Sequence, residues 1–168
     1  MSKVLGIVFS NMHETSMGDL TERRTMASVP FGGRYRMIDF MLSNLVNSGI
    51  SDVGIITKNN YLTLMKHLGN GKEWDLARKN GGLTILPPYS SSEAGVFKGR
   101  IEALAGIQGY IRESNAEYVV MTDCDTVAVV NYDEILKYHK EKDADITIVY
   151  QHKAVAKAQR NNTTVIKL

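Results

Sequence analysis

Residues 34–57 read RYRMIDFMLSNLVNSGISDVGIIT, and this stretch decides the fold class. Between residues 34 and 48 the apolar side chains recur at three- and four-residue spacing, which forms one stripe along a helix. Gly49 follows the stripe and suits the left-handed conformation that commonly ends a helix. The run 52–57 is then short and apolar, as expected of a buried strand. The stretch therefore predicts a helix followed closely by a strand.

The same alternation of short apolar runs and helical patterns continues on both sides. Further strands are predicted at residues 4–9, 83–86, 118–122 and 144–150, and further helices at residues 61–68, 98–112 and 133–140. Continuous apolar strands are typical of parallel sheets covered on both faces, and strand–helix alternation produces such sheets. The predicted fold is α/β and Rossmann-like, with a mostly parallel sheet and helices on both faces. We expect one domain over residues 1–168. Because the strand-like residues 163–168 stop without a turn, we expect a piece of a longer protein.

The composition is that of an ordinary globular protein, with 43% hydrophobic and 23% charged residues among 168. A net charge of +2 gives no indication of a nucleic-acid partner. The sequence has no apolar run of the roughly 18 residues that a membrane helix needs, so we expect no membrane partner. The single cysteine, Cys124, fits a reducing compartment, which predicts a cytoplasmic location.

Ligands of open α/β sheets bind beyond the carboxyl ends of the strands, which draws attention to residues 10–29 and 122–127. A phosphate-binding loop needs glycines for backbone approach and usually a cation. The loop over residues 10–18 has one glycine, no cation and an added carboxylate, Glu14. It is therefore a poor phosphate site on physical grounds, and His13 is interpreted as an ordinary loop histidine.

Two carboxylates, Asp123 and Asp125, follow the predicted strand 118–122. Such a pair can hold Mg²⁺, which prefers carboxylate oxygens and substrate phosphates. Aspartates also commonly stabilise turns, and the sequence leaves both interpretations open. Cys124 between them is expected to point into the core, as most unpaired cysteines do.

Residues 29–50 closely resemble the start of bacterial ADP-glucose pyrophosphorylases, the glucose-1-phosphate adenylyltransferases. The resemblance implies the N-terminal part of a nucleotide-diphospho-sugar transferase-like domain. The C-terminal left-handed β-helix of that family would be absent from a chain of 168 residues. Complete enzymes of the family make ADP-glucose from ATP and glucose 1-phosphate for glycogen biosynthesis.

The chain departs from the catalytic members of that family at the positions that handle phosphate. By the resemblance, their three loop glycines correspond to Asn11, Met12 and Glu14, and the arginine that ends the loop corresponds to Ser16. The lysine of their next motif corresponds to Met26. One well-placed cation contributes about 10³–10⁵ in rate to phosphoryl transfer, so we expect roughly 10⁴-fold less activity.

What remains, by the same resemblance, is a vestigial nucleotide site formed by Asn11, Met12, His13, Tyr89 and Gly99. The metal-binding aspartate of catalytic members corresponds to Asp125, so Mg²⁺ is the one cofactor implied. No catalytic residue is assigned.

This pattern is similar to the regulatory, GlgD-type subunit of the enzyme, which implies a chain that is inactive or weak alone and pairs with a catalytic subunit. Arg34 and Arg36 are assigned to the fold and to either an anionic effector, a sugar phosphate or a nucleotide, or a subunit contact. The alternative is that both form surface ion pairs with Asp39 or Glu22. Two alternatives stay open. One is an active nucleotidyltransferase with an atypical phosphate loop. The other is a pure interaction or scaffold domain whose strand ends are plugged by side chains such as Met12, Tyr89 or Arg100.

Overall fold

The structure, a computed structural model, describes residues 3–10, 17–88 and 97–151. The chain divides into two compact units, residues 1–135 and residues 136–168. The first unit holds a sheet and the helices that cover it. The strand-like residues 163–168 lie outside the described residues.

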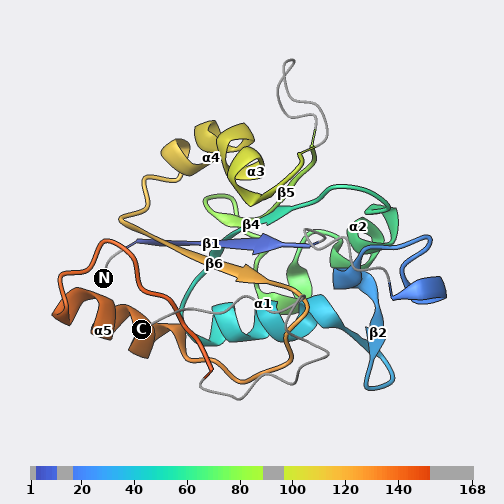
Figure 1. Cartoon of the computed structure of the whole chain (residues 1–168), viewed down its shortest axis with the longest axis horizontal. Coiled ribbons are helices and arrows are strands. Elements are labelled where there is room, and N and C mark those ends of the chain that lie inside the picture. The colour runs from blue at the N-terminus through green and yellow to red at the C-terminus, as the bar shows by residue number, and fades with distance from the viewer. Residues whose placement is uncertain (1–2, 11–16, 89–96, 152–168) are drawn as a thin grey trace, which may run out of the picture. The chain divides into compact units, whose positions relative to one another are not determined.

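Four parallel strands form the sheet of the first unit, in the order β5-β4-β1-β6 (Figure 1). The strands are β1 (Val4–Phe9), β4 (Asp52–Ile56), β5 (Gly82–Leu86) and β6 (Tyr118–Asp123). Their three pairings are all parallel. A separate antiparallel hairpin, β2 (Pro30–Phe31) with β3 (Tyr35–Arg36), precedes the first long helix. The predicted Rossmann-like α/β fold is confirmed.

The helices begin and end close to their predicted positions. They are α1 (Met37–Asn47), α2 (Leu62–Leu68), α3 (Arg100–Gly106), α4 (Gln108–Glu113) and α5 (Tyr132–Glu141), with short 3-10 helices η1 (Gly18–Leu20), η2 (Met26–Ser28) and η3 (Lys72–Trp74). Gly49 takes the predicted left-handed conformation after α1, with φ at 78°. Figure 1 places α1 on one face of the sheet and α3 with α4 on the other. Among the described helices, none has the length and hydropathy needed to cross a bilayer.

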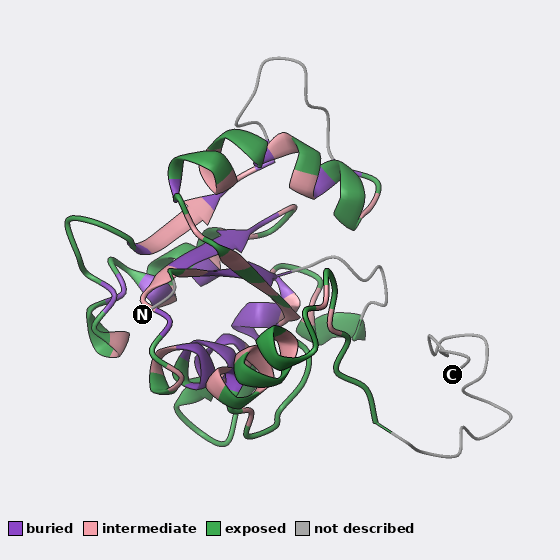
Figure 2. Ribbon diagram, turned by 90° about the vertical axis from the view of Figure 1, so that its left-hand side faces the viewer, coloured by how far each residue is buried: buried purple, intermediate pink, exposed green. Residues whose placement is uncertain are grey.

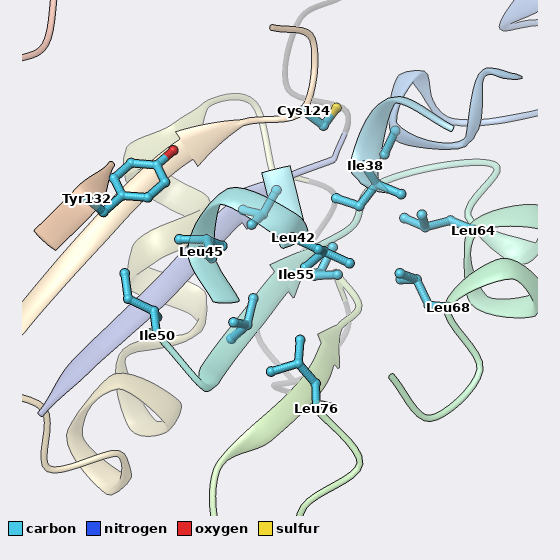
Figure 3. Close-up of a cluster of buried hydrophobic side chains, with 13 residues drawn as sticks. Ile38, Leu42, Leu45, Ile50, Ile55, Leu64, Leu68, Leu76, Cys124 and Tyr132 are labelled. Carbon is cyan, nitrogen blue, oxygen red and sulfur yellow. The ribbon is translucent and has the colours of Figure 1, made fainter. Parts of the chain in front are cut away.

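Side chains of β1 alternate between two hydrophobic cores, one on each face of the sheet. Val8 joins the first core, whose helical members come mainly from α1 and α2 (Figure 3). Leu5, Ile7 and Phe9 join the second core, with Ala103 of α3. Figure 2 shows buried residues concentrated in the sheet and on the sides of the helices that face it. The apolar run of β1 is continuous because both of its faces are covered.

The helix predicted over residues 98–112 is wrong in one respect, because it is two helices that meet at Ile107. Ile107 has φ −107° and ψ 13°, and its N–H bonds the carbonyl of Leu104, three residues back. Gly106 just before the break approaches the Phe97 ring closely: a β-carbon there would lie 3.1 Å from Phe97 Cε1. Glycine weakens a helix interior, and the break leaves Ile107 buried in the second core.

The strand predicted over residues 144–150 is also wrong, because the structure shows no regular element there. Ile146 and Ile148 are 78% and 60% exposed. A strand needs a neighbouring strand to pair with, and the described part of the second unit, residues 136–151, contains none. The alternation of apolar residues alone therefore does not produce a hydrogen-bonded β-strand.

Gly54 of β4 is one position where the sheet leaves no room for a side chain. A β-carbon there would lie 2.7 Å from Tyr110 Cε1 and 2.9 Å from Leu86 Cδ1. We expect Gly54→Ala to lower the free energy of unfolding by about 1–3 kcal/mol through overpacking. The matched control is Gly109→Ala in α4, where a β-carbon meets nothing within 4 Å. The control should be neutral, or stabilising by up to about 1 kcal/mol, and urea unfolding of both variants measures the difference. Equal stabilities for the two variants would contradict this packing.

Tyr110 makes the stability of the fold depend on pH in the alkaline range. Burial raises the pKa of Tyr110 to about 12, and the nearby Asp52 carboxylate, which accepts a hydrogen bond from the phenol at 3.3 Å, adds to the shift. A tyrosine in the unfolded chain ionises near pH 10, so the unfolded state loses its proton first. Stability should therefore fall as the pH rises from about 10 towards 12. Urea unfolding at pH 8–11 should show a shallower fall for Tyr110→Phe than for the unchanged protein. Parallel curves for the two would contradict the assignment.

Candidate functional site

The strand order places the candidate site between the carboxyl ends of β1 and β6. From β1 the chain adds β4 and β5 on one side and then crosses to add β6 on the other. The order therefore reverses at β1, and open α/β sheets bind ligands at such a point. Phe9 and Asp123, the last residues of the two strands, are partners in the register.

Ser10 ties the elements of this edge together. Its carbonyl accepts hydrogen bonds from the Ala27 N–H at 3.3 Å and from the Cys124 thiol at 3.2 Å. The Cys124 N–H donates to the Phe9 carbonyl at 3.3 Å. The buried Ser10 hydroxyl has no hydrogen-bond partner within the part of the chain that the structure describes. The ends of β1 and β6 and the helix η2 are thereby fixed to one another.

Cys124 points into the first core, as predicted, and is 3% exposed. Burial raises the pKa of its thiol, and the neighbouring carboxylates of Asp125 and Asp123 raise it further. A thiolate is the reactive form of cysteine. This residue is therefore a core side chain and not a nucleophile.

The two carboxylates beside it have different surroundings. Asp123 Oδ2 lies 2.6 Å from Nη2 of Arg100. Asp125 is exposed, and its Oδ1 accepts a hydrogen bond from the Thr126 hydroxyl at 3.4 Å. Across residues 3–10, 17–88 and 97–151 no three side chains of metal-binding type come together. The predicted role of Asp125, magnesium ligand or turn residue, stays a prediction.

Arg100 reaches across the edge from the first turn of α3. Its guanidinium carbon lies 5.8 Å from the centre of the Phe9 ring, in addition to its ion pair with Asp123. Gly99 just before it is extended, and the preceding Lys98 N–H donates to the Glu102 carboxylate at 2.7 Å. The start of α3 is thus held by its own acidic residue, with an arginine leaning over the strand ends.

Met26, which the resemblance assigns to the position of the family's lysine, lies in η2 and packs against the first core. Hydroxyl groups hold η2 in place: Ser28 Oγ lies 3.0 Å from Thr63 Oγ1 of α2 and 3.3 Å from Thr25 Oγ1, which donates to it. The apolar side chain at this position is therefore half-buried against the core. The other predicted site residues, Asn11, Met12, His13, Ser16 and Tyr89, lie outside the described residues, and so does Glu14.

The surface ion pairs expected for Arg34 and Arg36 are wrong. Within the described ranges neither guanidinium pairs with Asp39 or Glu22. Arg36 donates from Nη1 to the Thr63 carbonyl at 3.0 Å, and Arg34 lies over the Tyr35 ring at 5.2 Å.

Asp39 has other partners because it lies in the first turn of α1. Its carboxylate accepts the Arg36 backbone N–H at 3.0 Å, as a helix-capping side chain does. The other oxygen lies 2.6 Å from Nε2 of His67 in α2. No sequence pattern indicated His67 as a partner of Asp39.

Asn44 was also missed, although it lies in the stretch that decides the fold. From α1 it donates to the Ala128 carbonyl at 2.7 Å and accepts the Val130 N–H at 3.3 Å. It thereby fixes the segment that follows Asp125. The available signal was a polar residue at a core-facing position of the helix, since buried polar groups need partners.

The nucleotidyl transferase family profile matches residues 14–161, and the chain belongs to this family. It is similar to curated glucose-1-phosphate adenylyltransferases. That of Thermotoga neapolitana is 42% identical over 161 residues, which cover 95% of this chain and 38% of the relative. That of Thermosipho africanus is 39% identical over 169 residues, covering 100% and 41%. That of Clostridium acetobutylicum is 42% identical over 151 residues, covering 88% and 40%. The chain thus spans about two fifths of the length of these relatives.

Asn44→Ala should destabilise the first unit, because it leaves the Ala128 carbonyl and the Val130 N–H without their side-chain partner. We expect a loss of about 1–3 kcal/mol in the free energy of unfolding. The control is Asn47→Ala at an exposed position of the same helix, which should change stability by less than about 0.5 kcal/mol. Urea unfolding compares the two, and a neutral Asn44→Ala would show that the contact contributes nothing.

Proposed function

We propose that this chain belongs to a regulatory, catalytically deficient subunit of a glucose-1-phosphate adenylyltransferase that assembles with a catalytic subunit in the cytoplasm. The observation that carries the proposal is Met26. The position that the resemblance assigns to the family's lysine holds an apolar side chain packed against the core. The similarity to adenylyltransferases of 39–42% identity supports the ADP-glucose chemistry of the whole complex.

The proposed deficiency follows from what nucleotidyl transfer needs. Catalysis of phosphoryl chemistry consists mainly of positioning and of neutralising charge that develops on phosphate oxygens. Ser16 and Met26 supply no charge where catalytic members carry arginine and lysine. Asp125 offers a carboxylate, which can serve phosphate only through a bound cation. No step is therefore assigned to a residue of this chain.

Arg34 is the residue that we propose for an anionic effector, a sugar phosphate or a nucleotide. Its guanidinium is exposed over the Tyr35 ring, at the end of a hairpin. Arg36 instead donates to the Thr63 carbonyl, so its contact supports a structural role.

Co-expression of the full-length protein with its catalytic adenylyltransferase subunit tests the proposal. We expect a stable mixed complex by size-exclusion chromatography with light scattering, and a changed rate of pyrophosphate release from ATP and glucose 1-phosphate. The full-length protein alone should turn over roughly 10⁴-fold more slowly than the catalytic subunit.

The outcomes separate the alternatives. Release of pyrophosphate by the protein alone at the rate of the catalytic subunit would show a working enzyme with an atypical loop. In that case the double change Ser16→Arg and Met26→Lys should alter the rate little. A complex whose rate equals that of the catalytic subunit alone would favour a scaffold, the alternative that the Arg100 contact with Asp123 and Phe9 supports.

A further inference from the structure

The guanidinium of Arg100 lies at the carboxyl edge of the sheet and supplies a positive charge there. Arg100 extends from the first residue of α3 to the last residues of β1 and β6. Its Nη2 lies 2.6 Å from Asp123 Oδ2, and its guanidinium carbon lies 5.8 Å from the Phe9 ring centre. Both distances are those of favourable contacts, a charge-assisted hydrogen bond and a cation–π interaction.

The two contacts fix the guanidinium over the point where the strand order reverses. Phe9 and Asp123 are register partners on neighbouring strands, so a side chain that touches both spans the β1–β6 junction. Phe9 is buried and cannot move aside, because its ring belongs to the second core. The side chains of Arg100 and Asp123 are 45% and 30% exposed, so the pair lies at the mouth of this edge.

The donor set here does not fit a divalent cation with nucleotide phosphates. Mg²⁺ at such a site is held by one or two carboxylates together with substrate phosphates. Asp123 accepts a hydrogen bond from a fixed guanidinium, which also repels a second cation. Asp125, two residues further along the chain than Asp123, is exposed.

We propose that Arg100 is the residue that decides what this edge binds: as an internal cation it holds Asp123 and excludes a divalent cation with its nucleotide. The inference deepens the proposed function and rests on it in treating this edge as the nucleotide site. Arg100 would thus be a second cause of the proposed deficiency, and α3, which carries it, packs on the opposite face of the sheet from Met26. Restoring the family's lysine at position 26 would not remove it.

Binding of Mn²⁺ with ATP tests the inference by isothermal titration on the whole chain. Arg100→Ala should lower the Kd at least about tenfold relative to the unchanged protein, because one unit charge a few ångströms away is removed. Arg78→Ala is the matched control, since Arg78 forms an exposed ion pair with Asp75 at 2.5 Å and lies near the amino end of β5. The control should leave the Kd unchanged. Adding Asp123→Asn to Arg100→Ala should abolish the gain.

A second variant, Arg100→Gln, keeps the test valid should Arg100→Ala fail to fold, and circular dichroism shows which variants are folded. An unchanged Kd in a folded Arg100 variant would overturn the inference. Weaker binding would also overturn it, and would show that Arg100 anchors phosphate. The proposed function is tested by the absolute Kd of the unchanged protein and not by the ratio of Kd values between variants. A micromolar Kd of the unchanged protein for Mn²⁺ with ATP would contradict the proposed function whatever that ratio is.

Discussion

Strand β1 has both faces and both edges occupied, and the first unit is organised around that constraint. Its backbone pairs with β4 on one side and β6 on the other. Val8 enters the core with α1, whereas Leu5, Ile7 and Phe9 enter the core with α3 and α4. A strand with no polar face needs helices on both sides, so the layered architecture follows from six consecutive residues.

The same strand brings the candidate site together. Because parallel strands end at one edge, Phe9 of β1 and the following Ser10 lie beside Asp123 of β6 and the following Cys124. The Ser10 carbonyl then gathers Ala27 and Cys124 around itself. Hydrogen bonds therefore join the parts of this edge to one another, and Arg100 contacts Phe9 and Asp123 there.

Helix α1 contributes to the core and also contacts neighbouring segments through two polar side chains. Its apolar stripe supplies Ile38, Leu42 and Leu45 to the first core. Its polar residues Asp39 and Asn44 bind His67 of α2 and the segment after β6. One helix therefore connects α2 with the segment that follows β6.

The sequence by itself determined the elements with a local pattern. Continuous apolar runs predicted β1, β4, β5 and β6, the stripe over residues 34–48 predicted α1, and the stretch 29–50 identified the family. It also predicted the inward direction of Cys124. These features depend on residues a few positions apart, whose spacing is fixed by the geometry of a helix or a strand.

Only the tertiary structure decided which side chains meet. The pairs Arg100–Asp123, His67–Asp39 and Arg36–Thr63 join residues 23, 28 and 27 positions apart. Local periodicity carries no information on such contacts, because they depend on how whole elements pack. The same reason applies to the break at Ile107, which follows the close approach of Gly106 to Phe97, and to residues 144–150, which form no regular element despite their apolar alternation.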